Sequence, residues 1–384
     1  MNSLELLDII SSGETSRAQF KKRLDNRDGF AAEMIAMANS KGGDILIGVE
    51  DKTGDIVGLN YEELRSAGSI IANIGTDLVK PQIFPTTEVV NVEMEEDVKK
   101  VLVVHVEEGV AKPYKDRNGT IWIKQGADKR RLTDNNEQVR LFQHSGLVYV
   151  DEMIVPGTDA SDIDKDKVEE YLQKIDDSEI DVPAEQLHLN LNIIKEGRLT
   201  LGGLLFFAKN PQQFRPAFCI KAVSYIGNDI AGTDYRGSKD ITGTIPEMFE
   251  QAMGFFNTYL KHEQKGQNFN STGILEISPI ALEELLQSAL THRDYSKNAP
   301  VRILIFDNRV EIVSPGALPN NLTVENIKLG NTVVRNNLVV SFASKLMRYR
   351  GLGSGIRRAL KEHPATDLIN DTDRELFVSV LHRV

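Results

Sequence analysis

Residues 281–295, in the last third of the chain, have the periodicity of a helix with one apolar and one polar side. Leucine and alanine recur there at intervals of three and four residues, which predicts a helix that is buried along one face. Glu284 and Ser288 are one turn apart, so their side chains share the polar face. A carboxylate one turn from a hydroxyl is suited to holding a water molecule and a metal-bound phosphate. The same pattern is common in surface helices, so a second feature has to support a binding site.

That second feature is a glycine-rich loop further along the chain. Gly351, Gly353 and Gly355 come directly before a predicted helix that starts at Ile356. A glycine-rich loop that enters a helix offers backbone N–H groups and the positive helix end to a phosphate. The surrounding segment, 326–361, contains no acidic residue and many basic ones, which favours a phosphate-binding surface. A solvated basic face is the equally weighted alternative.

Length and composition limit the class of protein. A chain of 384 residues predicts two or three domains, and 41% hydrophobic with 26% charged residues is typical of a soluble globular protein. A single cysteine, Cys219, excludes a disulfide framework and a cysteine metal site. The net charge of −11 argues against a generally basic nucleic-acid coat. Because no apolar run approaches a membrane span and no basic leader is present, we expect a cytoplasmic protein without a membrane partner.

The predicted organisation is a domain at 1–150, a linker and helical connector at 151–210, and a second domain at 211–384. The linker prediction rests on the polar, Asp- and Ser-rich stretch 156–164. The connector is predicted to be a plain set of short helices, with a winged-helix-like module as the alternative. Residues 227–243, rich in Gly and Asp, are predicted to form a polar loop.

In the N-terminal segment, residues 30–39 have helical periodicity, and the paired glycines that follow would end that helix. Residues 44–49 read as a buried strand and 56–59 as its return strand after a turn. The run Ala-Asn-Ser-Lys-Gly-Gly-Asp-Ile-Leu-Ile-Gly-Val, with the later Ile-Trp-Ile-Lys-Gln-Gly at 121–126, resembles the Schlafen/AlbA-type nucleic-acid-binding domain. The resemblance covers about residues 5–145 and implies a mixed α/β domain that contacts nucleic acid.

The resemblance also bears on catalysis. The Schlafen branch of the family cleaves RNA with three carboxylates, two on the first helix and one after the Ile-Gly-Val strand. The matching positions here are Glu14, Gln19 and Asp51. An amide at position 19 lowers the charge and the metal affinity of such a site, which puts nuclease activity in doubt but leaves binding intact. The residues expected to meet phosphates or to stack on a base are Lys41, Trp122, Lys124, Lys129, Arg130 and Arg131.

The C-terminal segment resembles the GHKL-type ATP-binding (Bergerat) fold, in the divergent form found in bacterial helicase-related regulators. The resemblance is carried by Glu284 with the His-Arg-Asp-Tyr run at 292–295, by Pro-Gly at 315–316, by Arg-Asn at 335–336, and by the glycine loop at 351–356. It implies an α/β sandwich and, with the N-terminal domain, an α+β fold class overall. A protein-kinase interpretation of His-Arg-Asp fails, because residue 299 is Ala where a kinase needs Asn.

Carried over to this chain, the resemblance assigns Glu284 as the general base that orients the attacking water. Ser288 stands where the family places a Mg²⁺-ligating Asn, and Ser314 where it places an adenine-reading Asp. We therefore expect weak or absent hydrolysis, with ATP and Mg²⁺ as the candidate cofactors and no metal-ligand set assigned. The expected cofactor-binding residues are Ser288, His292, Gly316, Arg335, Gly351, Gly353, Ser354 and Gly355.

Three functions are compatible with these features. The leading hypothesis is a DNA-binding transcriptional regulator, a closed homo-oligomer whose degenerate nucleotide-binding domain serves sensing or oligomerisation. The first alternative is a metal-dependent nuclease that acts on RNA and is gated by ATP. The second is a non-catalytic ATP-binding module in signalling or defence.

Overall fold

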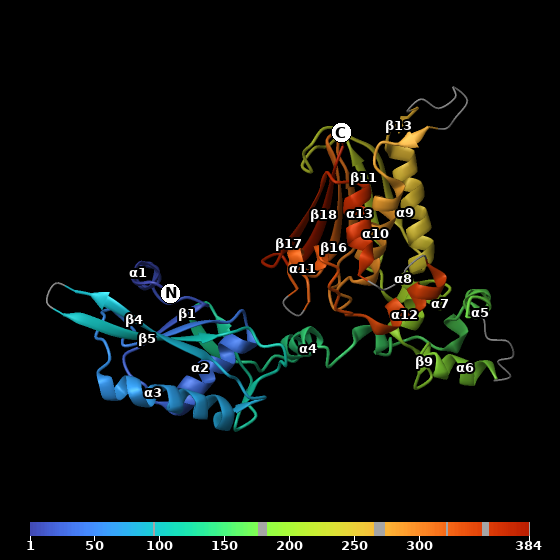
Figure 1. The fold of residues 1–384 in the computed structure, drawn as a ribbon. Coiled ribbons are helices and arrows are strands. Elements are labelled where there is room, and N and C mark those ends of the chain that lie inside the picture. The colour runs from blue at the N-terminus through green and yellow to red at the C-terminus, as the bar shows by residue number, and fades with distance from the viewer. Residues whose placement is uncertain (95–96, 176–182, 265–272, 320–321, 348–352, 384) are drawn as a thin grey trace. The chain divides into compact units, whose positions relative to one another are not determined.

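The computed structural model describes residues 1–94, 97–175, 183–264, 273–319, 322–347 and 353–383 (Figure 1). The chain divides into two compact units, 1–148 and 149–384. Both combine helices with β-sheet, so the predicted α+β class is confirmed. Among the described helices, none has the length and apolar character needed to cross a membrane.

Unit 1 is built on a four-stranded sheet that is buried on both faces. The central strand β2 alternates its side chains: Ile45 and Ile47 point into a core under helices α2 and α3, and Leu46 points into a second core with Leu6 of helix α1. β1 runs parallel to β2, and the other pairs are antiparallel. In spatial order the strands are β1 (Ala18–Lys21), β2 (Gly43–Ile47), β5 (Val98–Val106) and β4 (Thr86–Glu93).

A close backbone approach joins the first two strands. Gly43 has φ +152°, and a Cβ there would lie 2.4 Å from the carbonyl oxygen of Arg17. Only glycine lets the chain leave helix α2 and enter β2 directly beside β1. The helices of this unit are α1 (Ser3–Ser12), α2 (Arg27–Asn39), α3 (Tyr61–Asn73), the π-helical turn η1 (Ile74–Leu78) and α4 (Asn135–His144).

A two-stranded hairpin, β7–β8, packs against α2. Asn39, the last residue of α2, fixes this arrangement: its Nδ2 donates to the carbonyl oxygens of Tyr114 (2.8 Å) and Trp122 (2.9 Å). The return strand predicted at 56–59 is wrong, because only a single bridge forms, between Val49 and Ile56. The short strands of this region are β3 (Val79–Lys80), β6 (Lys115–Asp116), β7 (Trp122–Gln125) and β8 (Asp128–Arg131).

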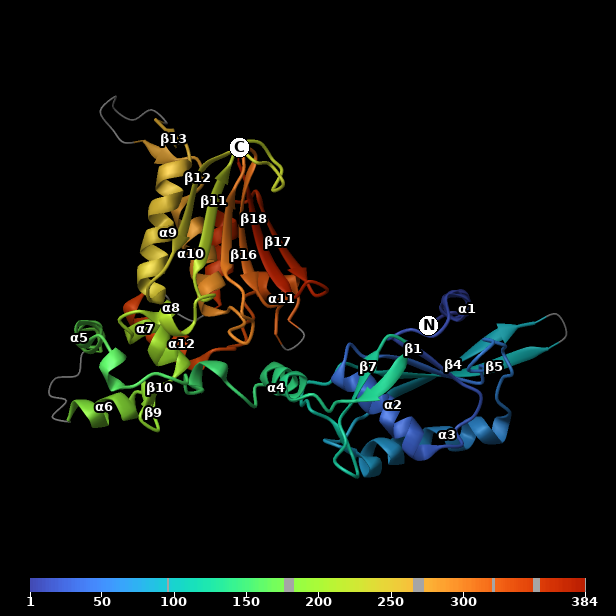
Figure 2. The same cartoon turned by 180° about the vertical axis from the view of Figure 1, so that it is seen from behind.

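Unit 2 is built on a six-stranded mixed sheet, and helices α9, α10 and α13 cover one face of it (Figure 1). Figure 2 shows the sheet from its other face. The polar loop predicted at 227–243 is partly wrong, because residues 235–241 form the edge strand β12. In spatial order the strands are β12 (Tyr235–Ile241), β11 (Ile220–Tyr225), β15 (Val301–Ile305), β16 (Arg309–Pro315), β18 (Leu376–His382) and β17 (Thr366–Asp371).

Residues 151–210 contribute to the core of this same unit. The ring of Phe342 packs edge-on against the rings of Phe207 and Tyr171, with ring centroids 4.9 Å and 5.5 Å apart. Helices that come before the sheet in the chain therefore share one aromatic cluster with a helix that lies between two of its strands. The buried Asp151 accepts the backbone N–H of Val339 at 3.0 Å, which ties the start of the unit to helix α12. The remaining elements are η2 (Val150–Glu152), η3 (Ala160–Asp162), α5 (Lys165–Gln173), α6 (Ala184–Asn190), β9 (Ile194–Lys195), β10 (Arg198–Leu199), α7 (Leu201–Phe207), α8 (Pro211–Phe214), α9 (Ile245–Tyr259), β13 (His262–Glu263), β14 (Ile274–Leu275), α10 (Pro279–Thr291), α11 (Val324–Lys328), α12 (Asn337–Leu346) and α13 (Ser354–Glu362).

Candidate functional site

A pocket in unit 2 lies between helix α10, the start of helix α13 and strands β16 and β18. Its volume is about 1030 Å³, counting the space at its open mouth. The residues expected from the sequence to bind a cofactor gather here, although Gly351 lies outside the described residues. Glu284, the expected general base, lines the pocket as well. The expected cofactor-binding residues that line it are Ser288, His292, Gly316, Gly353, Ser354 and Gly355.

Part of the pocket lining is apolar and also carries two hydroxyl groups. Leu285 of α10, Ile312 of β16 and Phe377 of β18 form its walls. Ser314 donates from Oγ to the carbonyl oxygen of Ala289 at 3.0 Å, so this hydroxyl is engaged with the helix. Ser379 faces the same space from the next strand. An apolar slot with a few polar groups is the usual form of a site for a planar ring.

The first turn of α13 forms another part of the lining. Gly353 adopts φ +67°, and its backbone comes so close to Gly330 that a Cβ would lie 2.1 Å from the Gly330 carbonyl oxygen. The helix starts at Ser354, and Ser354, Gly355 and Ile356 of its first turn line the pocket. The first N–H groups of a helix have no partner within the helix and form its positive end. A Cβ on Gly355 would lie 2.5 Å from Glu284 Oε2, so the absence of a side chain there admits the carboxylate.

Glu284 is held in an ion pair that the sequence did not predict. Arg358 Nε donates to Glu284 Oε1 at 2.6 Å, and the two side chains are 38% and 16% exposed, respectively. Arg358 lies one turn after Ser354, on the face of α13 that lines the pocket. The sequence contains a signal for Arg358, because it lies one helical turn after Ser354 and so falls on the same face of the helix. The neighbouring Arg357 lies on another face and is exposed.

His292 and Arg335 stabilise the edge of the pocket. Burial, and then the positive charge of Arg335, lower the pKa of His292 to about 4, so this imidazole is neutral near pH 7. Arg335 Nη2 donates to the carbonyl oxygen of Ala317 at 2.6 Å, which holds the loop after β16. Burial raises the pKa of Asp294, but Arg335 and Ser296 outweigh it and lower that pKa overall. Arg335 is thus a residue that supports the pocket without lining it.

The His-Arg-Asp run has a structural explanation. Arg293 is 2% exposed, and its guanidinium lies over the rings of Phe218 at 4.4 Å and Tyr295 at 5.0 Å. It also donates to backbone carbonyl oxygens of Lys297 and Ala299. This side chain therefore joins helix α10 to the sheet.

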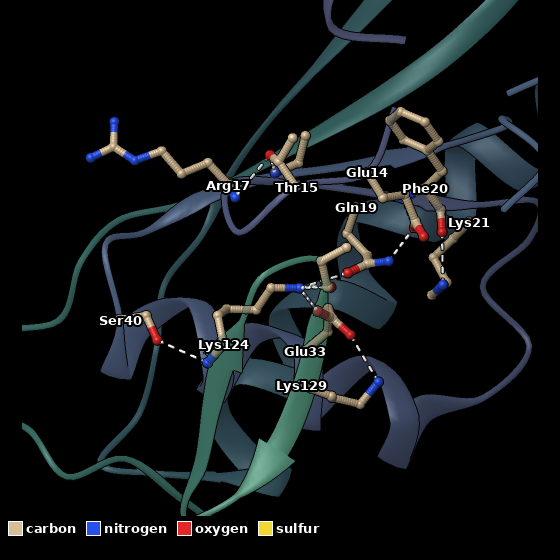
Figure 3. A network of polar contacts seen from close by, with 12 residues as sticks. Glu14, Thr15, Arg17, Gln19, Phe20, Lys21, Glu33, Ser40, Lys124 and Lys129 are labelled. Carbon is tan, nitrogen blue, oxygen red and sulfur yellow. Dashed lines mark hydrogen bonds and ion pairs between the residues drawn. The ribbon is translucent and has the colours of Figure 1, made fainter. Parts of the chain in front are cut away.

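Glu14 and Gln19, two of the three family positions in unit 1, belong to a polar network (Figure 3). Glu14 Oε1 accepts the Gln19 side-chain amide and the Phe20 backbone N–H. Gln19 Oε1 accepts Lys124 Nζ at 2.7 Å, and Lys124 Nζ also lies 2.8 Å from Glu33 Oε1. The expectation that positions 14 and 19 lie on the first helix is wrong: Glu14 precedes β1 and Gln19 lies on it.

Asp51 has different partners. Its Oδ2 accepts Lys21 Nζ at 2.6 Å, and its Oδ1 accepts the Lys22 backbone N–H at 3.2 Å. Within the described residues, no three side chains of His, Cys, Asp or Glu are grouped so that they could hold one metal ion. The three family positions therefore do not form a carboxylate triad here.

The basic residues expected to contact nucleic acid divide into two sets. Lys124 is buried, Lys129 Nζ pairs with Glu33 Oε2 at 2.8 Å, and Arg130 makes a two-pronged contact with Glu137. Lys124 is therefore withdrawn from the surface, which corrects its expected role. Lys41 and Arg131 are exposed. Arg131 lies 5.3 Å from the half-buried ring of Trp122, whose Nε1 donates to Asp116 Oδ2 at 2.9 Å.

Family models match segments near both ends of the chain. Residues 14–133 match the family model described as "Schlafen, AlbA_2", and residues 298–372 match the one described as "Putative ATP-dependent DNA helicase recG C-terminal". A third match, over residues 140–221, is to a domain of unknown function. The predicted combination of an N-terminal Schlafen/AlbA-type domain with a C-terminal HATPase-type domain is thereby confirmed.

Matches to whole proteins are more distant. The crystal structure of the DIP2311 protein from Corynebacterium diphtheriae is similar over 99% of this chain and 80% of that chain, at 19% identity and a TM-score of 0.48. No curated protein matches the chain.

Proposed function

We propose that this protein binds nucleic acid through unit 1 and an adenine nucleotide through the pocket of unit 2, and that it acts as a DNA-binding transcriptional regulator. The observation that carries the proposal is that six residues expected to bind a nucleotide line one pocket together with Glu284, the expected general base. Residues 298–372, which contribute to this pocket, match the family model described as "Putative ATP-dependent DNA helicase recG C-terminal". The regulator role follows from pairing this pocket with a Schlafen/AlbA-type domain.

The donor set of the pocket fits a nucleotide. The wall of Leu285, Ile312 and Phe377 suits a base, and the hydroxyl of Ser379 in the same lining suits the polar edge of a base. The first turn of α13 and Arg358 suit phosphates.

The fit to Mg²⁺ is poorer. A bound Mg²⁺ would supply charge neutralisation for a phosphate transfer. Glu284 is the carboxylate among the described residues that line the pocket, and it is paired with Arg358. The neighbouring Ser288 offers a hydroxyl in place of an amide oxygen. We therefore propose a nucleotide sensor with slow or no hydrolysis.

Unit 1 supports binding better than cleavage. The Lys124 ammonium lies among oxygens of Gln19, Glu33 and Ala127. A divalent cation at this place would need the same oxygens as ligands, and the positive charge of Lys124 would repel it. Lys41 and Arg131 are exposed, and positive charge at the surface attracts a phosphate backbone.

The test is a gel-shift titration of the full chain with duplex DNA, single-stranded DNA and RNA at two salt concentrations, with and without ATP. Binding to duplex DNA that weakens with salt is expected. Loss of all nucleic-acid binding at low salt would refute the regulator role and leave an ATP-binding signalling or defence module. Cleavage of RNA in Mn²⁺ or Mg²⁺ that disappears in a Glu14→Ala variant would favour the nuclease instead.

Oligomeric state is a separate part of the proposal. Proteins that read symmetric DNA sites commonly form closed dimers, so we propose a homo-oligomer. Light scattering on the full chain, in the presence and absence of ATP, tests this, and a monomer under both conditions would refute it.

A further inference from the structure

Arg358 is the only arginine or lysine among the described residues that line the pocket. Its guanidinium is committed to Glu284, from Nε to Oε1 at 2.6 Å. The two charges cancel, and the remaining titratable lining residue, His292, is neutral near pH 7. The pocket in this state carries no net charge from its described lining side chains.

A nucleotide with phosphates would change this balance. Glu284 Oε2 lies at the first turn of α13, since a Cβ on Gly355 would come within 2.5 Å of it. Phosphates bound at this helix end would meet the Glu284 carboxylate directly, and like charges at short range repel. A guanidinium can relieve the repulsion, because its planar fork binds phosphate oxygens with two parallel hydrogen bonds.

We propose that Arg358 exchanges Glu284 for the terminal phosphates of a bound nucleotide, and that this exchange makes the pocket selective for nucleoside polyphosphates over nucleosides. The inference rests on the proposed binding of a nucleotide in this pocket. In the ion pair, Arg358, which would bind the phosphates, and the Glu284 carboxylate are both engaged with each other. In the filled pocket, Arg358 holds phosphate and the Glu284 carboxylate is released.

The exchange predicts opposite effects for its two members. Arg358→Gln removes the phosphate ligand, so ATP binding weakens by about tenfold or more while adenosine binding changes less than about twofold. Glu284→Gln removes the competitor for Arg358, so ATP binding tightens by several-fold and adenosine binding stays the same. Arg357→Gln is the matched control: it is the neighbouring arginine on the same helix, it is exposed, and it should leave both ligands unaffected.

The experiment is isothermal titration of the full chain and of the three variants with ATP and with adenosine, at one fixed MgCl₂ concentration. Far-UV circular dichroism verifies that each variant is folded. If the wild type binds neither ligand, the proposed nucleotide function itself is refuted.

If the wild type binds ATP and Arg358→Gln binds it equally well, the role of Arg358 is refuted while the pocket assignment stands. Equal losses of ATP and adenosine in Arg358→Gln would mean that Arg358 only supports the pocket, which also overturns the inference. If Glu284→Gln fails to tighten ATP, the competition between carboxylate and phosphate is absent and the exchange is wrong.

Discussion

Lys124 and Glu33 form a buried ion pair in unit 1, with Nζ and Oε1 2.8 Å apart and side chains that are 1% and 2% exposed. A buried charge is tolerated only when it is paired and hydrogen-bonded. Lys124 also donates to Gln19, and Gln19 donates to Glu14. The network thereby connects hairpin β7–β8, helix α2 and strand β1, and it holds the candidate catalytic Glu14 in place.

Replacing Lys124 by Met should strongly destabilise unit 1. Methionine is similar in size to lysine but carries no charge, so Glu33 stays buried with Lys129 as its remaining cation. Breaking a buried ion pair typically costs about 3–5 kcal/mol. Urea unfolding followed by the fluorescence of Trp122, the one tryptophan, measures the loss. Lys129→Met is the matched control, since that lysine meets the same carboxylate at a 28% exposed position and should cost less. Equal costs for both would contradict the buried-pair argument.

Gln19→Glu should destabilise unit 1 at neutral pH without creating a nuclease. The Gln19 amide donates to Glu14, so a carboxylate at this position would bring two acidic groups into contact and raise the pKa of one of them. The loss should be on the order of 1–3 kcal/mol at pH 7 and should shrink as the pH falls and one group gains a proton. Tryptophan-monitored urea unfolding at several pH values measures it.

The same variant tests the metal argument. Because the Lys124 ammonium remains among the oxygens, no RNA cleavage in Mn²⁺ is expected from Gln19→Glu. Cleavage by this variant, absent in a Gln19→Glu, Glu14→Ala double variant, would contradict that prediction.

Regular periodicity made much of the fold predictable. Helices α2 and α10 and strand β2 have apolar residues at helix or strand spacing, and they form close to where the sequence places them. Strand β12 was not predicted, because it is an edge strand with mostly exposed side chains and lacks the alternation of apolar and polar residues that marks a half-buried strand. The predicted return strand at 56–59 failed where Gly58 takes φ +76°, which breaks the extended conformation.

The candidate site was predictable only in part. Glu284, Ser288 and Gly355 follow from spacing and resemblance. Helical phase could also have identified Arg358, but not its pairing with Glu284, which lies 74 positions away. Glu33 could not be identified, because its role is defined by Lys124, 91 positions away. A single sequence carries no signal that links such positions.

The buried Asp151 should make the stability of unit 2 depend on pH. Burial raises its pKa to about 6, although backbone N–H groups of Val339 and Leu338 oppose the shift. Because the folded-state pKa lies above the ordinary value of 3.8, the folded protein binds this proton more tightly than the unfolded chain does. This residue's contribution to stability is therefore greatest at low pH, falls between about pH 4 and 6, and is constant above that window. Asp151→Asn should remove this pH dependence, which urea unfolding of the full chain by circular dichroism can measure.

Two glycines should respond to alanine in opposite directions. Gly316 has φ +105°, and a Cβ there would lie 2.4 Å from the Asp294 Cβ and 2.5 Å from Arg335 Nη1. Gly316→Ala therefore has to displace the loop that Arg335 holds, and it should destabilise unit 2 and weaken any nucleotide binding. Gly254, in helix α9, has open space around its Cβ position, so Gly254→Ala should stabilise by about 0.5–1 kcal/mol and leave the pocket unchanged. Calorimetric melting and ATP titration of both variants measure these effects. If Gly316→Ala melts and binds like the wild type, the loop after β16 is not fixed by Arg335 and Asp294 as described.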